Sequence, residues 1–315
     1  MTHGQIAIEA AKKWGFDADE LTLAAHRENI VYRAATPTGD YALRLHRPGY
    51  RTKAELRSEL HWMAAIHAAG ISVPRPIAAQ SGALVCEVDH TLIDVLTWLP
   101  GRPIGAKGVL HKIADPANLV RQLGQTMSKI HSITDGWTPP PDFTRPAWDR
   151  AGLLGDTPLW GQFWTHPNLT PSERDLLERA RAAADDHLAR IEPDLDFGLI
   201  HADMITENLL INDSTLSVID FDDGGYGFRA FDVVTFLFRF RGSDQFETLK
   251  TALLDGYSTR ARLDEETFDL FMLLRAFTYV GWIKDRMEIP ASAERSALAI
   301  ATASTLARRY LNRLG

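Results

Sequence analysis

The stretch Leu199–Asp232, LIHADMITENLLINDSTLSVIDFDDGGYGFRAFD, decides the fold of this chain. Inside it, two short apolar runs flank an Asn-Asp turn: Leu209–Ile211 comes before the turn and Leu216–Ile219 after it. Short apolar runs joined by such a turn predict a pair of strands. We therefore expect the segments on either side of the pair to be brought to one place.

The polar residues around this strand pair suggest a chemistry. Asp203 and Asn208 precede the pair, whereas Asp220 and Asp222 follow it. Hard cations such as Mg²⁺ prefer oxygen ligands, so we expect Asn208 and Asp220 to hold the metal. Asp222 shares a face with Asp220 by strand alternation and is a further candidate ligand. Asp203 is then the carboxylate that orients an acceptor hydroxyl, and together these residues predict a centre for phosphoryl transfer.

The composition excludes several other classes of protein. The chain has 315 residues, enough for two lobes, and a formal net charge of −7. No basic run indicates nucleic acid, and no apolar stretch is long enough to span a bilayer. The single cysteine, Cys86, and an N-terminus without a signal-peptide pattern favour the reducing cytoplasm.

The pattern along the chain predicts an α+β fold with two parts. Residues 1–99 form an N-terminal lobe with an antiparallel sheet and one key helix, 51–69, which carries Glu59. Residues 100–315 form a larger, mainly helical lobe. The strands of the first lobe are expected at Leu21–Ala25, Ile30–Ala35, Tyr41–His46, Ala83–Val88 and Leu92–Leu99. The helices of the second are expected at 117–132, 171–191, 230–241, 244–260, 265–286 and 291–313.

The central stretch resembles the catalytic core of the aminoglycoside phosphotransferase and choline kinase-like families, which share the protein-kinase fold. His201-Ala202-Asp203 with Asn208 is similar to their catalytic loop, and Asp220-Phe221-Asp222 stands where protein kinases carry D-F-G. Bacterial phosphotransferases and homoserine kinase type II belong to the same broad group. The resemblance implies structural support from His201, which braces the loop, and from Asp232, which opens a helix and holds the loop in place.

The resemblance also implies a nucleotide site in the N-terminal lobe. Arg44 occupies the place of the usual strand lysine, and Glu59 is the matching acid of the helix. Trp98 and Leu99 lie in the hinge that would contact adenine. A glycine-rich loop is expected over the phosphates at 24–29, but that segment contains no glycine. The backbone must then approach the phosphates more loosely, or Arg27, Glu28 and Asn29 must supply the contacts in another geometry.

We therefore expect an ATP- and Mg²⁺-dependent kinase of a small hydroxylated metabolite that carries an amine, such as an aminoglycoside, an amino alcohol or a hydroxy amino acid. One alternative is a Ser/Thr protein kinase of the same fold. Against it, the segment from Asp222 to a helix near Arg229 is too short for a regulated activation loop. Another alternative is a pseudokinase that binds nucleotide without catalysis.

Overall fold

A computed structural model describes residues 1–26, 29–260 and 262–314. The chain forms two compact units, and each is assembled from separate segments of the sequence. The first unit contains residues 1–104, 132–145 and 207–222, and the second contains residues 105–131, 146–206 and 223–315. Each unit is described by itself below.

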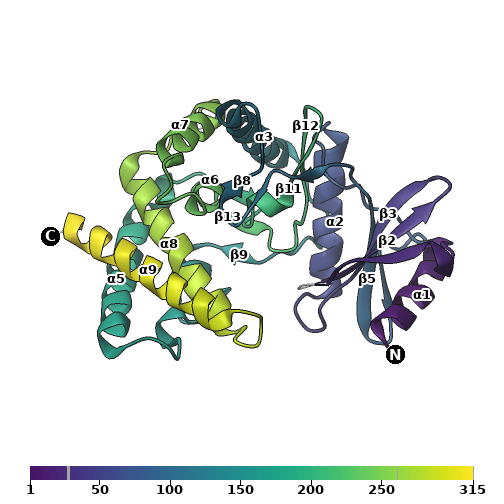
Figure 1. Ribbon diagram of the computed structural model, residues 1–315, viewed down its shortest axis with the longest axis horizontal. Helices are drawn as coiled ribbons and strands as arrows, with labels where there is room; N and C mark the ends of the chain where they lie inside the picture. The colour runs from purple at the N-terminus through teal and green to yellow at the C-terminus, as the bar shows by residue number, and fades with distance from the viewer. Residues whose placement is uncertain (27–28, 261, 315) are drawn as a thin grey trace. The chain divides into compact units, whose positions relative to one another are not determined.

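The first unit is organised around an antiparallel sheet of five strands in the order β1-β2-β3-β5-β4 (Figure 1). All neighbouring strands in this sheet are antiparallel, as the sequence predicted. Its strands are β1 (Leu21–His26), β2 (Ile30–Thr36), β3 (Gly39–Leu45), β4 (Val85–Val88) and β5 (Thr91–Thr97).

Strand alternation in β3 gives this sheet one apolar side and one charged side. Leu43 and Leu45 point into a core that is closed by helix α1 (His3–Trp14), which contributes Ile6, Ala7, Ala10, Ala11 and Trp14. Arg44 points to the opposite side, where it meets helix α2 (Lys53–Ala68). The sheet thus carries an ordinary hydrophobic core on one side and a buried cluster of charges on the other.

The first unit also contains the predicted strand pair. β11 (Leu209–Asn212) and β12 (Thr215–Val218) are antiparallel, with Leu209 opposite Val218, and the short strand β6 (Arg102–Pro103) extends their sheet. β12 ends at Val218, and Asp220 has a left-handed backbone with φ of 68°. Strand alternation therefore does not reach Asp220 and Asp222, and the face that we expected them to share is a wrong prediction. The side chain of Asp220 is exposed, whereas that of Asp222 is buried.

The second unit is mainly helical. Helix α8 packs against α6 and α9, and α9 also packs against α5 (Figure 1). A small sheet of β10 (Phe197–Ile200), β13 (Gly225–Phe228) and β9 (Ala147–Trp148) lies beside α6. A two-stranded sheet joins β7 (Gly105–Ala106) and β8 (Val109–Leu110). The α-helices are α3 (Pro116–Gly136, whose last turn belongs to the first unit), α4 (Arg150–Leu154), α5 (Pro171–Ile191), α6 (Arg229–Phe238), α7 (Phe246–Tyr257), α8 (Glu265–Lys284) and α9 (Ser292–Leu314).

Local sequence explains why several of these helices begin where they do. In α5, Thr170 caps the first turn together with Glu173, and Pro171 stands at the first helical position. Asp264 caps α8 by accepting a hydrogen bond from the backbone N–H of Thr267. Within the described residues, none of the helices combines the length and the apolar character that crossing a bilayer requires.

Candidate active site

The loop after β10 is held by a carboxylate from α6. Asp232 is fully buried in the first turn of that helix. Its carboxylate accepts hydrogen bonds from the backbone N–H of His201 at 2.9 Å and of Ala202 at 2.7 Å. Ala202 has a φ of 64°, an unfavourable conformation for a residue with a β-carbon. The two bonds to Asp232 help to stabilise this turn, and His201 Nδ1 accepts a further bond from the backbone N–H of Asp203 at 3.3 Å.

His131 continues this network into the interior of the second unit, and sequence reasoning missed it. Its Nε2 lies 3.0 Å from Asp232 Oδ2 and its Nδ1 lies 2.9 Å from the hydroxyl of Tyr257. Burial lowers the pKa of His131, so the ring is neutral at pH 7. The neutral tautomer that fits these contacts donates from Nε2 to Asp232 and accepts from Tyr257 at Nδ1. Sequence offered no signal for it, because His131 stands 101 residues before Asp232.

Asp203, the expected base, is anchored by an arginine of α8. Arg275 Nη2 donates a hydrogen bond to Asp203 Oδ1 at 2.9 Å, and the Asp203 side chain remains 22% exposed. Arg275 is buried, and its guanidinium lies over Trp160 at 4.9 Å and over Phe231 at 5.6 Å. Burial lowers the pKa of Arg275 from its usual value, although the group stays charged near neutral pH. Because the stacked arginine has little freedom, it fixes one oxygen of Asp203. We did not expect this contact, since Arg275 sits in a helix whose pattern otherwise indicates core packing.

The first unit holds the three expected metal ligands. The backbone N–H of Ile219 donates to the carbonyl of Asn208 at 2.9 Å, which continues the ladder of β11 and β12 by one residue. This bond places Asp220 next to a residue paired with Asn208, although twelve positions separate the two in the sequence. The strand pair thus brings Asn208 and Asp220 to its open end. Asp203 belongs to the second unit, so the convergence of all three groups stays a prediction.

Asp222 is a buried carboxylate with an incomplete set of partners. Its Oδ1 makes no hydrogen bond within the described residues, and the nearest cation is Arg51 Nε at 3.8 Å. Burial, followed by the charge of Glu59, raises the pKa of Asp222. A bound cation would lower the free energy cost of burying the charged Asp222 carboxylate, so the oxygen donors here fit Mg²⁺. Among the described residues, no three His, Cys, Asp or Glu side chains lie together in a group that could hold a metal ion.

The expected partners Arg44 and Glu59 are in contact, but a second carboxylate dominates their surroundings. Arg44 Nη1 donates to Glu59 Oε1 at 2.9 Å. Its Nε and Nη2 donate to Asp94 at 2.7 and 2.8 Å, and His46 Nε2 lies 2.7 Å from the same carboxylate. Burial alone would raise the pKa of Asp94, but Arg44 and His46 hold it well below its usual range. Asp94 was missed, although an Asp inside the apolar run 92–99 was a usable signal.

A second arginine, Arg145, connects Glu59 to the turn that follows β12. It is fully buried and lies 3.4 Å from Glu59 Oε2. Its Nη2 donates to the carbonyl oxygens of Phe221 at 3.0 Å and of Asp222 at 2.6 Å. Arg145 thereby links Glu59 of α2 to the segment Asp220–Asp222 inside the first unit. The proline-rich sequence around it gave no reason to expect this role.

The remaining nucleotide candidates lie beside the ends of strands in the five-stranded sheet. The backbone N–H of Trp98 donates to the carbonyl of Asp40 at 2.9 Å, so only other groups of the hinge could contact adenine. Leu99 follows it and is half-buried. Asn29 Oδ1 accepts a hydrogen bond from the backbone N–H of Arg47 at 3.2 Å. Arg27 and Glu28, which we expected beside Asn29, lie outside the described residues.

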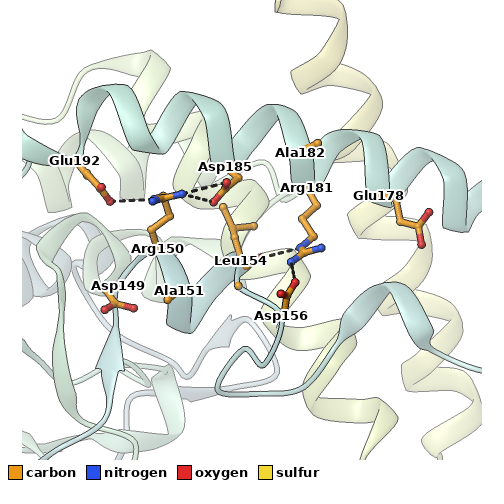
Figure 2. Close-up of a pocket in the computed structure, with 11 residues that line it drawn as sticks. Asp149, Arg150, Ala151, Leu154, Asp156, Glu178, Arg181, Ala182, Asp185 and Glu192 are labelled. Atoms are coloured by element: carbon orange, nitrogen blue, oxygen red, sulfur yellow. Dashed lines mark hydrogen bonds and ion pairs between the residues drawn. The ribbon is translucent and has the colours of Figure 1, made fainter.

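A separate pocket lies between α4 and α5, away from all of these candidates. It has a volume of about 580 Å³, and its arginines are already paired (Figure 2). Arg150 Nη1 lies 3.0 Å from Asp185, and Arg181 Nη2 lies 3.1 Å from Asp156. Because these cations are neutralised within the pocket, its charge does not single out a ligand.

Comparison with known proteins identifies the family. Residues 20–266 match the profile of the phosphotransferase enzyme family. The homoserine kinase of Gluconobacter oxydans is 27% identical in an alignment 289 positions long that covers 82% of each chain. A solved structure of a microcompartment-associated aminopropanol kinase is 28% identical, with a TM-score of 0.84 over 98% of both chains. The structure of the amicoumacin kinase hAmiN in complex with AMP-PNP, Ca²⁺ and Ami shares the fold, with 21% identity and a TM-score of 0.79 over 98% of this chain and 94% of that one.

These matches confirm both the family resemblance and the α+β fold expected from the sequence. The profile covers the N-terminal sheet, the loop that carries Asp203 and most of the helical part of the chain. The match therefore includes every candidate residue named from the sequence, but it ends before Arg275. The chain belongs to the phosphotransferase enzyme family, and it is a kinase.

Proposed function

We propose that this kinase transfers the γ-phosphoryl group of ATP, with Mg²⁺, to a hydroxyl of a small amine-bearing metabolite. The observation that carries the proposal is the anchoring of Asp203. Its loop is held by Asp232 and its carboxylate by Arg275. A carboxylate that is fixed in this way is suited to orient an alcohol and to accept its proton late in the reaction.

The other candidates take supporting roles in this proposal. Asn208, Asp220 and Asp222 hold Mg²⁺, which bridges the phosphates of the nucleotide and neutralises their charge. Arg44 is the cation of the nucleotide site, and Glu59 together with Asp94 fixes its orientation. Residues 1–99 then serve mainly nucleotide binding, whereas residues 100–315 serve catalysis and acceptor binding.

The names of the relatives support a small acceptor. Homoserine and aminopropanol, which appear in those names, both carry an alcohol and an amine. Asp223 is a half-buried carboxylate of the second unit, in which Asp203 also lies, and we propose it as the partner of the acceptor amine. The hAmiN complex holds AMP-PNP and Ca²⁺, which is consistent with a nucleotide and a divalent metal for the fold.

A protein substrate is less well supported. Protein kinases carry a long segment between the metal-binding Asp and the next helix. Here the segment after Asp222 is already paired as β13 with β10, and α6 begins at Arg229. Little chain therefore remains to form a docking platform for a peptide.

The proposal is tested by a screen of small hydroxylated amines and amino acids with Mg·ATP, read out as coupled ADP release. Asp220→Asn should raise the Mg²⁺ concentration for half-maximal rate by about tenfold or more, because a charged ligand becomes neutral. Asp213→Asn is the matched control, since Asp213 is an exposed aspartate with a φ of 51° in the neighbouring turn. A chain that binds Mg·ATP and releases no ADP with any acceptor would be a pseudokinase, and the proposal would fail.

A further inference from the structure

Two arginines of the second unit, Arg275 beside Asp203 and Arg239, have fewer hydrogen-bond partners than their charges require. Arg275 reaches Asp203 through Nη2, but its Nη1 is buried and has no hydrogen-bond partner within the described residues. A buried guanidinium usually satisfies more of its five donors, because each unpaired group is costly. The charge of Arg275 is therefore only partly compensated by the protein.

Arg239 is the second of these cations. It follows the last residue of α6, and its guanidinium lies over the ring of Tyr279 at 5.7 Å (Figure 1 shows α6 and α8). Tyr279 stands four residues after Arg275 on α8, so both lie on one face of that helix. Within the part of the chain that the structure describes, the Arg239 side chain makes no hydrogen bond or ion pair. It is half-buried and held against Tyr279, so its charge is confined to this face.

Aromatic side chains extend this face along α8. Tyr279 and Trp282 stack on each other, with ring centroids 5.7 Å apart and planes 8° from parallel, and both are half-buried. Together with Trp160, which lies against Arg275, they supply flat apolar surfaces around the two arginines. Such surfaces beside a few polar groups are typical of sites for small molecules.

The positive charges of Arg275 and Arg239 favour the binding of an anion at this face. Burial lowers the pKa of Arg275 most, and the charge of Asp203 raises it; the charge of Arg239 lowers it further, and that of Asp223 raises it. Arg239 makes no ion pair within the described residues, so a further negative group beside it would stabilise both cations. A carboxylate matches the planar fork of a guanidinium and forms strong charge-assisted hydrogen bonds with it.

We propose that Arg239, with the charge of Arg275 behind it, binds a carboxylate of the phosphate acceptor. The acceptor is then a hydroxy amino acid rather than a simple amino alcohol or an aminoglycoside. This inference rests on the proposed function, because it places the acceptor beside Asp203, and it narrows the class of molecule that the site accepts.

Three matched pairs of acceptors test the inference, since the members of each pair differ only in the carboxylate. The pairs are L-threonine with 1-amino-2-propanol, L-serine with ethanolamine, and L-homoserine with 3-amino-1-propanol. We expect kcat/KM, measured by coupled ADP release, to favour the acid in at least one pair by about tenfold or more, the effect of one charge-assisted hydrogen bond. Equal rates, or a preference for the amino alcohol, would overturn the inference while supporting the proposed function.

The variant Arg239→Met then locates the effect. It should lower kcat/KM for the acid by about tenfold or more and leave that for the amino alcohol within about twofold. Arg239→Lys should recover part of the loss. Arg241→Met is the control, because Arg241 is a half-buried arginine that lies over Phe238 at 4.1 Å and donates to Thr302. It should leave both rates unchanged.

Two other results would contradict the assignment. If Arg239→Met raises KM for ATP equally with both members of a pair, the anion is a phosphate of the nucleotide. If none of the six compounds is phosphorylated, calorimetric titration of the three acids in the presence of Mg·AMP-PNP decides the question. Absence of binding there overturns the carboxylate site, whereas ADP release with some other acceptor would still support the proposed function.

Discussion

The carboxylate of Asp94 accepts two hydrogen bonds from Arg44 across neighbouring strands. Arg44 of β3 lies directly opposite Asp94 of β5, and two of its nitrogens donate to that carboxylate at 2.7 and 2.8 Å. Glu59 holds a third nitrogen at 2.9 Å. The cation proposed for the nucleotide site is therefore fixed by two buried acids rather than by one. This arrangement explains how an arginine can be accommodated where the fold normally uses a lysine.

The first prediction concerns stability. Asp94→Asn removes the charge that compensates a buried guanidinium, and breaking such a pair costs about 3–5 kcal/mol. We expect the free energy of unfolding, measured by urea titration, to fall by an amount of this order. Asp40→Asn is the control, because Asp40 pairs with Arg33 at the surface and the change should cost less than about 1 kcal/mol. If Asp94→Asn lowers the free energy of unfolding no more than Asp40→Asn does, the proposed role of Asp94 in fixing Arg44 is contradicted.

The second prediction concerns pH. The folded-state pKa of His131 is lowered by burial, so the unfolded chain binds a proton at a pH where the folded chain does not. Stability should therefore fall as the pH drops below about 6.5, with a slope of at most about 1.4 kcal/mol per pH unit for this one group. Urea titrations between pH 8 and pH 5 measure that slope.

Two variants assign the slope to His131. His131→Gln should reduce the slope, because the replacement cannot take up a proton. His90→Gln should leave it unchanged, since the His90 side chain is 96% exposed. Equal slopes in the wild type and in His131→Gln would show that His131 is not the group responsible.

The third prediction concerns the orientation of Asp203. Arg275→Met keeps the stacked bulk against Trp160 but removes the donor to the carboxylate. We expect kcat to fall by about 10- to 100-fold with KM for ATP nearly unchanged, because orientation matters most in the transition state. The kcat of Arg275→Lys should lie between that of the wild type and that of Arg275→Met. Arg241→Met again serves as the control, and an unchanged kcat in a folded Arg275→Met would rule out a positioning role.

The sequence predicted the main elements of the fold because their signals are local. Helix α5 runs over the residues expected from the sequence pattern, and all five strands of the first sheet lie within a few residues of their expected positions. Alternation in β3 correctly separated the apolar Leu43 from the charged Arg44. These features depend on periodicity and on capping, and both can be read from neighbouring residues.

The sequence could not predict the partners that complete the site. Asp94 contacts Arg44, and Arg145 contacts Glu59, from distant segments of the sequence. His131 contacts Asp232 in the same way. Such pairs are set by strand register and by packing between helices, for which one sequence carries no direct signal. The face that Asp220 was expected to share with Asp222 was wrongly predicted for a local reason. The left-handed backbone of Asp220 ends the strand alternation that the sequence pattern indicated.

The central claim is that Asp203 is the base of a phosphoryl-transfer centre, and Asp203→Asn tests it most directly. The substitution preserves shape and removes the negative charge. Single-turnover transfer from Mg·ATP to the best acceptor should slow by about 100- to 10,000-fold, with the affinity for Mg·ATP in a calorimetric titration within about twofold of the wild type. A variant that binds nucleotide normally and transfers phosphate at the wild-type rate would contradict the account.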